Sequence, residues 1–489
     1  MSRFLSRART FNSSLFLRYA SVARVALVAF ICAVCAFSTI NPRAQETTKP
    51  TAPADNTRGV TQSPQQQLQT PDEPQTVAAR LYAEADGFVD KKFQEYRTKG
   101  IGYSQALHES SLREQREIAE RNAAQLASTA ETLAPADFYY VAALYELALK
   151  EPEALQFYQR FLKEAVNVSA EQKQKARASV ITLAANKDSL EVAEATLVDY
   201  KNTQPQMLVE QFRFYAPLAQ ANRRAKRYER AIELANESIK IARSQPSVSA
   251  EDRAARDDSL SAVTDFIVAV YMETNRKPEA VRALENLRQM SLALPSSVLY
   301  AQTSKQLATL GARVNPLLSL TRNNNDGATG LTSVAPNVAA KEWIDQKPTS
   351  ISNLRGRVVV LDFWATWCSP CIRAFPTLAS WHRKYNRRGL TILGVTQYYG
   401  AAGAKNQNAT PAQELAYLRI FKRQHRLPYG FAINDSSENM ARYGVQPIPT
   451  VVVIDKKGRV RHMTVGGGDR AEELELERLI QKLLAEPAA

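Results

Sequence analysis

The spacing of hydrophobic and polar positions changes several times along this 489-residue chain. An uncharged apolar run at residues 25–40 gives way to a stretch poor in large apolar residues and rich in Pro, Thr and Gln. Apolar residues then recur at helical spacing, and near the C-terminus short apolar runs alternate with helical patterns. This pattern predicts an export segment (1–40), a flexible linker (41–76), a helical domain (77–311), a second linker (312–334) and an α/β domain (335–489).

The helical region contains internal similarity. Four segments align on one alanine each, and every segment follows a polar turn: the alanines are Ala154, Ala193, Ala231 and Ala280. This resembles a helical-hairpin solenoid of the tetratricopeptide kind, in which each hairpin buries its face against its neighbours. The spacing varies and most consensus positions are missing, so a plain helical bundle stays open. With His108 as its only histidine, the region predicts a scaffold that binds another protein rather than a catalytic domain.

The last third of the chain predicts a mixed sheet. Buried-type strands are expected at residues 358–364, 390–396, 431–434, 450–455 and 459–465, the last two joined as a hairpin. Helices are expected at residues 411–425 and 470–486. The second of these helices places five apolar residues on one face, which should cover the sheet: Leu476, Leu479, Ile480, Leu483 and Leu484. The fold class is therefore an all-α repeat domain followed by an α/β domain.

The N-terminus predicts export. Arginines precede the apolar run, and positive charges stay on the cytoplasmic side of a membrane, so everything after residue 40 should lie outside the cytoplasm. The run is intermediate in length between a signal-peptide core and a membrane span, so cleavage and tethering both stay open. Cys32 and Cys35 lie inside this run and read as small hydrophobic residues of the export segment.

Composition and charge change this picture little. With 45% hydrophobic and 23% charged residues the chain is an ordinary globular protein. The net charge of +14 would suit acidic partners or anionic lipid, but no nucleic-acid-binding motif is present. The basic run at residues 381–389 is typical of a solvated helix face, with a binding patch as the alternative.

The chemistry concentrates at Cys368-Ser-Pro-Cys371. A buried strand precedes this segment and a helical pattern begins at its second cysteine, which places Cys368 at a helix N-terminus. Unpaired amides and the helix dipole there favour a thiolate. Cys371 lies one turn inward, less exposed and within disulfide reach. Pro370 stiffens the first turn, and Pro376 should kink the helix beyond it. This predicts an accessible nucleophile and a protected resolving thiol.

Two other interpretations of the pair are weaker. A zinc site needs about four ligands, but the other two cysteines lie in the export segment, and His382 and His425 are isolated. A purely structural disulfide would close a loop too short to stabilise the fold much.

The segment FWATWCSPC resembles the active site of the thioredoxin superfamily, specifically the exported TlpA/ResA-like thiol-disulfide oxidoreductases. The resemblance covers residues 335–485, and Ile448-Pro449-Thr450 is similar to the family's cis-proline loop. It implies a thioredoxin-like fold with Cys368 as the attacking nucleophile and Cys371 as the resolving cysteine. It also implies that Pro449 is a cis proline facing the disulfide and that the Ile448 backbone pairs with a substrate strand.

The same resemblance assigns the residues around the pair. Trp367 would shield the site and Trp364 would pack beneath it, while Ser369 and Pro370 complete the surface that meets substrate. Asp362 falls where thioredoxins keep a buried acid that takes the proton of the resolving cysteine. On an apolar strand its pKa should be raised, which suits a general base. The alternative is a strand-end Asp362 exposed to water.

This sequence differs from the family's usual pattern at two places that bear on its choice of partners. Ala374 replaces an acidic residue that is common before the helix proline in this family, and residues 394–400 replace the usual acidic turn after the second strand. Both put the family's partner preferences in question, but not its redox chemistry.

The resulting prediction is an exported reductase of disulfides in substrate proteins, recharged by a membrane electron donor and needing no bound cofactor. A dithiol oxidase or isomerase is the alternative within the class. An adaptor whose thioredoxin fold only binds is the alternative outside it. A peroxidase of the peroxiredoxin type is disfavoured, because Cys368 lacks that family's Pro-x-x-x-Thr-x-x-Cys context.

Overall fold

A computed structural model describes residues 76–245, 249–311, 334–403, 408–467 and 470–487. The predicted export segment, and all but the last residue of each predicted linker, lie outside the described residues. No helix in the described ranges is both long enough and apolar enough to cross a membrane. The chain divides into two compact units, one up to Ile241 and one from Ala242 onward.

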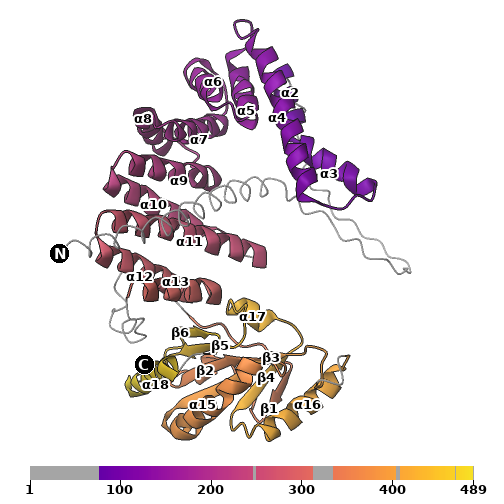
Figure 1. Cartoon of the computed structure of the whole chain (residues 1–489), viewed down its shortest axis with the longest axis vertical. Coiled ribbons are helices and arrows are strands. Elements are labelled where there is room, and N and C mark those ends of the chain that lie inside the picture. The colour runs from indigo at the N-terminus through magenta and orange to yellow at the C-terminus, as the bar shows by residue number, and fades with distance from the viewer. Residues whose placement is uncertain (1–75, 246–248, 312–333, 404–407, 468–469, 488–489) are drawn as a thin grey trace, which may run out of the picture. The chain divides into compact units, whose positions relative to one another are not determined.

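The first unit is helical (Figure 1). Its elements are α2 (Val77–Asp86), α3 (Phe88–Thr98), α4 (Gln105–Ala127), the 3₁₀ turn η2 (Pro135–Asp137), α5 (Phe138–Leu147), α6 (Glu151–Glu164), α7 (Ala170–Asn186), α8 (Leu190–Lys201), α9 (Leu208–Arg224) and α10 (Tyr228–Ser244). Serine hydroxyls cap the N-terminal amides of α4 and α7: that of Ser104 accepts from Leu107, and that of Ser169 accepts from Gln172.

One turn recurs in the helical region and explains its internal similarity. The residues Leu149, Asp188, Lys226 and Asn275 each take a left-handed conformation, with φ of 58°, 57°, 60° and 58°. After each of them the next amide bonds back five residues, as in Lys150 to Tyr145 and Ser189 to Ala184, which is the helix-ending Schellman arrangement. The four aligned alanines each follow such a turn by five residues, and all four are fully buried. The aligned segments are therefore the second helices of recurring hairpins.

The second unit contains three further helices and the sheet. The helices are α11 (Ala250–Glu273), α12 (Lys277–Ala293) and α13 (Ser297–Thr309). The strands are β1 (Glu342–Ile344), β2 (Val358–Phe363), β3 (Leu390–Gln397), β4 (Gly430–Asn434), β5 (Thr450–Ile454) and β6 (Val460–Val465), and they lie in the order β1-β4-β3-β2-β5-β6. Strands β2, β3 and β4 are parallel, whereas β1, β5 and β6 are antiparallel to their neighbours.

The remaining elements of this unit are α15 (Ser369–Tyr385), α16 (Pro411–Gln424), α17 (Glu438–Arg442) and α18 (Arg470–Ala485), with short 3₁₀ turns η3 (Ser352–Leu354) and η4 (Asn386–Arg388). All five predicted strands are present within a residue or two of their expected bounds, and the apolar face of α18 is buried as predicted. The spacing of apolar residues did not predict β1 or α17. The predicted fold class, a helical region followed by an α/β domain with a mixed sheet, is confirmed.

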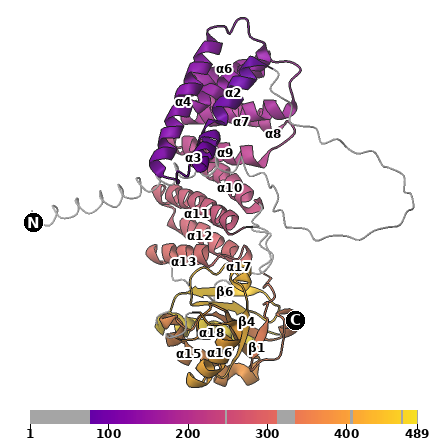
Figure 2. The same ribbon diagram turned by 90° about the vertical axis from the view of Figure 1, so that its right-hand side faces the viewer.

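Both faces of the sheet are covered, because alternate residues of β2 enter two separate apolar cores. Val358, Val360 and Trp364 pack with α15, α16 and α18. Val359, Leu361 and Phe363 pack on the other face, where Leu292 of α12 and Tyr300 of α13 join the core. Figures 1 and 2 both show α13 beside β6 and α17. Helices α12 and α13 thus contribute to the hydrophobic core of the α/β domain.

The recurring alanines allow a test of the hairpin packing within a single helix. Ala193 of α8 is fully buried, whereas Ala195, two residues further on, is exposed. We expect Ala193→Leu to lower the free energy of unfolding by about 1–3 kcal/mol, because a buried site without space must move its neighbours. Ala195→Leu should change it by less than about 0.5 kcal/mol. Urea denaturation followed by circular dichroism measures both, and equal effects would contradict the hairpin packing.

Candidate active site

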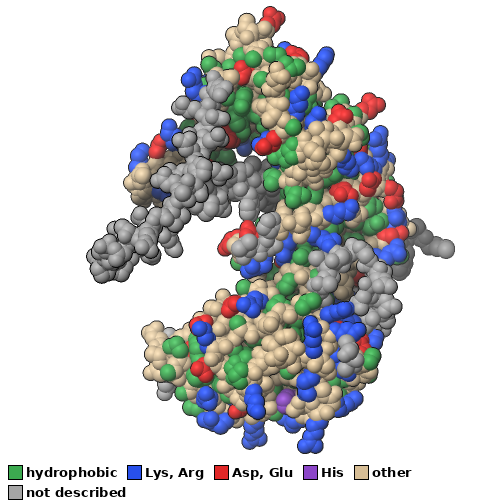
Figure 3. Space-filling view, turned by 180° about the vertical axis from the view of Figure 1, so that it is seen from behind, with side chains coloured by type: hydrophobic (Ala, Val, Ile, Leu, Met, Phe, Trp, Pro, Cys, Tyr) green, Lys and Arg blue, Asp and Glu red, His purple; other side chains and the backbone are tan. Residues whose placement is uncertain are grey.

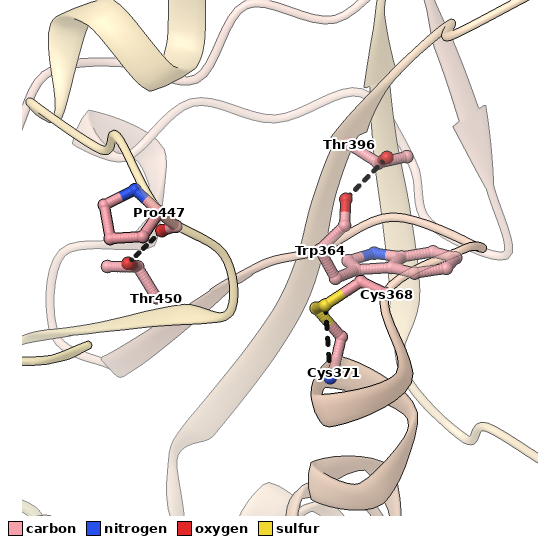
Figure 4. The surroundings of a disulfide bond; sticks show 6 residues. All are labelled: Trp364, Cys368, Cys371, Thr396, Pro447 and Thr450. Atoms are coloured by element: carbon pink, nitrogen blue, oxygen red, sulfur yellow. Dashed lines mark hydrogen bonds between the residues drawn. A yellow bond between two sulfur atoms is a disulfide. The ribbon is translucent and has the colours of Figure 1, made fainter. Parts of the chain in front are cut away.

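The first helical turn after β2 holds the two cysteines of the site. Cys368 is the N-cap residue of α15, and its Sγ accepts a hydrogen bond from the Cys371 amide at 3.2 Å. The two residues form a disulfide with a Cα–Cα distance of 5.3 Å, which Figure 4 shows at the tip of the helix. Ser369 and Pro370 are the first two residues of α15, and Pro376 lies inside it without ending it. The predicted placement of Cys368 at a helix N-terminus is confirmed.

Exposure at the disulfide differs from the prediction. Cys371 is fully buried as expected, but Cys368 is also only 4% exposed. In this oxidised form Cys368 Sγ is bonded to Cys371, and the residue packs in the core that contains Trp364. The exposed residues here are Trp367, with 60% of its surface accessible, and Ser369. The expectation of an accessible Cys368 is therefore wrong for the disulfide form.

Asp362 is a buried carboxyl without a partner. It is 1% exposed, and neither side-chain oxygen has a hydrogen-bond partner among the described residues. Because successive residues of a strand point to opposite faces, Asp362 shares its face with Val360 and Trp364, the side that contains the disulfide. Burial raises the pKa of Asp362 from 3.8 to about 7. The alternative of a strand-end Asp362 exposed to water is wrong.

Trp364 forms the floor of the site. Its ring is fully buried and lies against Phe375 of α15 and Phe421 of α16. Its carbonyl accepts a hydrogen bond from Thr396 Oγ1 at 2.8 Å (Figure 4). Gly394 of β3 leaves room for this ring, since a Cβ there would lie 2.9 Å from Trp364 Nε1. The expected packing of Trp364 beneath the disulfide is what the structure shows.

The loop between α17 and β5 lies beside the strand end that leads to the disulfide. The Ile448–Pro449 peptide is cis, as predicted. Thr450 pairs with Phe363 of β2, and its Oγ1 donates to the Pro447 carbonyl at 2.8 Å (Figure 4). The Pro449 carbonyl accepts from the Gly466 amide at 2.8 Å. Ile448 is half-buried, and it packs against the apolar core that contains both cysteines.

The sequence did not reveal the role of Glu414. This residue is in the first turn of α16 and is 2% exposed. Its carboxylate accepts hydrogen bonds from the amides of Tyr399, Gly400 and Ala401. The Tyr399 ring lies 5.6 Å from that of Trp367, edge to face. An acid from α16 therefore holds the turn that follows β3, and the only sequence signal is an acidic residue after the Thr410 N-cap.

A metal site and a basic binding patch are the two other kinds of site that the sequence raised. Among the residues that the structure describes, no three His, Cys, Asp or Glu side chains are grouped so that they could hold a metal ion. The basic run at residues 381–389 covers the end of α15 and the 3₁₀ turn η4. Trp381 and Tyr385 are buried, Arg383 and Arg387 are exposed, and Lys384 pairs with Glu477 at 2.8 Å. Figure 3 shows Lys and Arg side chains spread over the surface of the second unit.

Comparison with known proteins shows similarity over the α/β domain. The model of the AhpC/TSA family matches residues 331–463. ResA, a thiol-disulfide oxidoreductase of Bacillus thuringiensis subsp. konkukian, is 30% identical over 141 residues, which are 29% of this chain and 72% of ResA. Protein DipZ of Mycobacterium bovis is 31% identical over 172 residues, 34% of this chain but only 23% of DipZ. The crystal structure of a thioredoxin-family thiol:disulfide interchange protein from Chlorobium tepidum covers 31% of this chain and 96% of its own at 23% identity, with a TM-score of 0.25.

The raised pKa of Asp362 predicts a pH dependence of stability in the oxidised protein. Between about pH 4 and pH 7 the folded protein keeps the Asp362 proton that the unfolded chain releases. The free energy of unfolding should therefore fall as pH rises, by about 1.4 kcal/mol per pH unit from this group. In Asp362→Asn the amide cannot ionise, so this contribution should be lost and the variant should be the more stable protein at pH 8. Urea denaturation from pH 4 to pH 8 measures the difference, and parallel curves would contradict an isolated buried carboxyl.

Proposed function

Through its C-terminal domain this chain belongs to the ResA-like family of thiol-disulfide oxidoreductases, and on that premise we propose that it reduces disulfides of substrate proteins outside the cytoplasm. The observation that carries the proposal is a set of three groups on the strand and the helix that meet at one junction. Cys368 caps α15, Cys371 is buried one turn inward, and Asp362 is buried on the same side of the sheet without a partner.

In the reduced protein the helix dipole of α15 and the Cys371 amide, which donates to Cys368 Sγ, favour the Cys368 thiolate. This thiolate attacks one sulfur of a substrate disulfide, so that an enzyme–substrate S–S bond forms while the substrate bond breaks and one substrate thiolate leaves. Cys371 then gives its proton to Asp362 and attacks Cys368 Sγ, which releases the second substrate thiolate. Two electrons have passed to the substrate, and the enzyme ends as the disulfide of Figure 4.

Asp362 suits the role of proton acceptor because of its surroundings. A carboxyl with a pKa of about 7 accepts and returns a proton near neutral pH, which an exposed Asp does not do. Burial without a hydrogen-bond partner costs free energy, and this cost is easiest to understand if the group acts on the buried thiol of Cys371.

The surface around the disulfide suits an extended peptide. We assign substrate contacts to the exposed Trp367 and Ser369, to the half-buried Pro370, and to the backbone of Ile448 beside cis Pro449. An extended substrate segment could pair with that backbone, while its disulfide sulfur faces Cys368.

The proposal also includes the direction of electron flow, from the enzyme to the substrate. Ser369-Pro370 resembles the Gly-Pro and Glu-Pro dipeptides of reductases more than the Pro-His of strong oxidants. A dithiol oxidase or isomerase would use the same residues in reverse. An adaptor that uses the fold only for binding would not need the cysteines.

The cellular setting is inferred from the N-terminal residues. The arginine-rich start and the apolar run at residues 25–40 support export, with a tether if the run is retained. A reductase outside the cytoplasm must be recharged with two electrons, for which a membrane donor is the natural source. The helical hairpins of the first unit would bind a partner protein.

Trapping with Cys371→Ser tests the chemistry. Without its resolving thiol the enzyme should remain joined to substrates through Cys368, and these complexes should appear on non-reducing gels and disappear with dithiothreitol. Cys368→Ser is the matched control, because it keeps the buried Cys371 but removes the nucleophile at the N-cap. If neither variant forms mixed disulfides, or both form them equally, the assigned roles are wrong.

A further inference from the structure

The start of α13 touches the loop that carries the cis proline. The Ser297 amide donates to the Gly444 carbonyl at 2.9 Å, and Ser297 Oγ accepts from the Gln446 amide at 3.3 Å. Ser297 is fully buried. A residue of the helical region, 149 positions before Gln446 in the sequence, is therefore bonded to both sides of Val445.

The backbone approach at this contact leaves no room for a side chain. Gly444 has φ of +60°, and a Cβ there would lie 1.9 Å from the Pro295 carbonyl oxygen. Only glycine combines this conformation with so close a neighbour. The loop and the turn before α13 thus meet backbone to backbone.

A second contact fixes α13 on the sheet. Tyr300, one turn into α13, is buried, and its hydroxyl lies 2.7 Å from Nδ1 of His462 in β6. Burial, with the nearby Arg288 of α12, lowers the pKa of His462 to about 3, so the imidazole is neutral near neutral pH. Strand β6 pairs with β5, the strand that Thr450 begins. The hairpin α12–α13 is therefore attached at two points. Tyr300 contacts strand β6 of the sheet, and Ser297 contacts the loop.

The held segment is short. Gln446 is followed by Pro447, Ile448 and cis Pro449, and Thr450 already pairs with β2. With Gln446 bonded at one end and Thr450 in the sheet at the other, the three residues between have little freedom to move. Gln446 and Pro447 are themselves exposed, so the packing of their side chains does not hold the loop.

From these contacts we propose that Ser297 is a positioning residue for the Ile448–Pro449 loop. The hairpin α12–α13 is then part of the substrate-binding apparatus of the α/β domain rather than a separate module. Its catalytic consequence rests on the proposed function: a loop already held in place presents the Ile448 backbone to a peptide without first being ordered. If the loop were free, part of the binding free energy would be used to order it. Loss of the Ser297 contact should therefore raise KM and leave kcat unchanged.

Two serines at the start of α13 provide a matched pair for the test. Ser297→Ala removes the hydroxyl that accepts from Gln446 and should leave the helix cap intact. Ser296→Ala removes the N-cap hydroxyl, which accepts from Leu299, without touching the loop hydrogen bond. Helix capping alone would make Ser296→Ala the more damaging change. Positioning of the loop would make Ser297→Ala the more damaging change for substrate binding.

Hydrogen exchange of the full-length protein reports on the loop without any substrate. Exchange in the peptide covering residues 445–450 should be faster in Ser297→Ala than in wild type and unchanged in Ser296→Ala. With dithiothreitol as donor, Ser297→Ala should raise KM for insulin about two- to tenfold, the loss expected for one hydrogen bond. Its kcat, and its reduction of hydroxyethyl disulfide, which has no peptide backbone, should not change.

Exchange as slow in Ser297→Ala as in wild type would overturn the inference. So would an unchanged KM in an enzyme that does reduce insulin. If the wild-type protein reduces no protein disulfide, the proposed function has failed, while the exchange comparison still supports or refutes the positioning of the loop.

Discussion

The junction between β2 and α15 is the constraint on which the site depends. All six residues of β2 are buried, because the strand lies in the middle of the sheet with an apolar core on each face. A strand held in this way fixes where the chain emerges, and five residues after Phe363 the chain starts a helix with Cys368 as its cap. The cysteine pair, its acid and the cis-proline loop are all placed relative to that one strand end.

Asp362 is where the strand departs from the rule that the core is apolar. A carboxyl between Leu361 and Phe363, with no hydrogen-bond partner in the described structure, is a local inconsistency of the kind expected at functional sites. Its surroundings turn the cost of burial into a raised pKa, and the same burial protects the thiol of Cys371. Under the proposed function, stability and chemistry draw on one feature, the burial of Asp362 and Cys371.

Periodic features of the chain were predictable from the sequence. The five strands and the face of α18 follow from spacing alone, and the disulfide and cis Pro449 follow from motifs. Contacts between distant residues left no such signal. The three-residue strand β1 exists only through its pairing with β4. The role of Glu414 depends on hydrogen bonds that its carboxylate accepts from amides of a turn outside its own helix. The near-complete burial of Cys368 was mispredicted, because local pattern does not report how the disulfide packs.

Reduction potential is the quantity that tests the account most directly, since the central claim is that Cys368 and Cys371 donate electrons to substrate disulfides. Equilibration of the full-length protein with dithiothreitol redox buffers, followed by alkylation of free thiols, gives this value. We expect a potential near that of thioredoxin, about −270 mV. A value near about −120 mV, typical of strong oxidants, would contradict a reductase and assign the site to the opposite reaction.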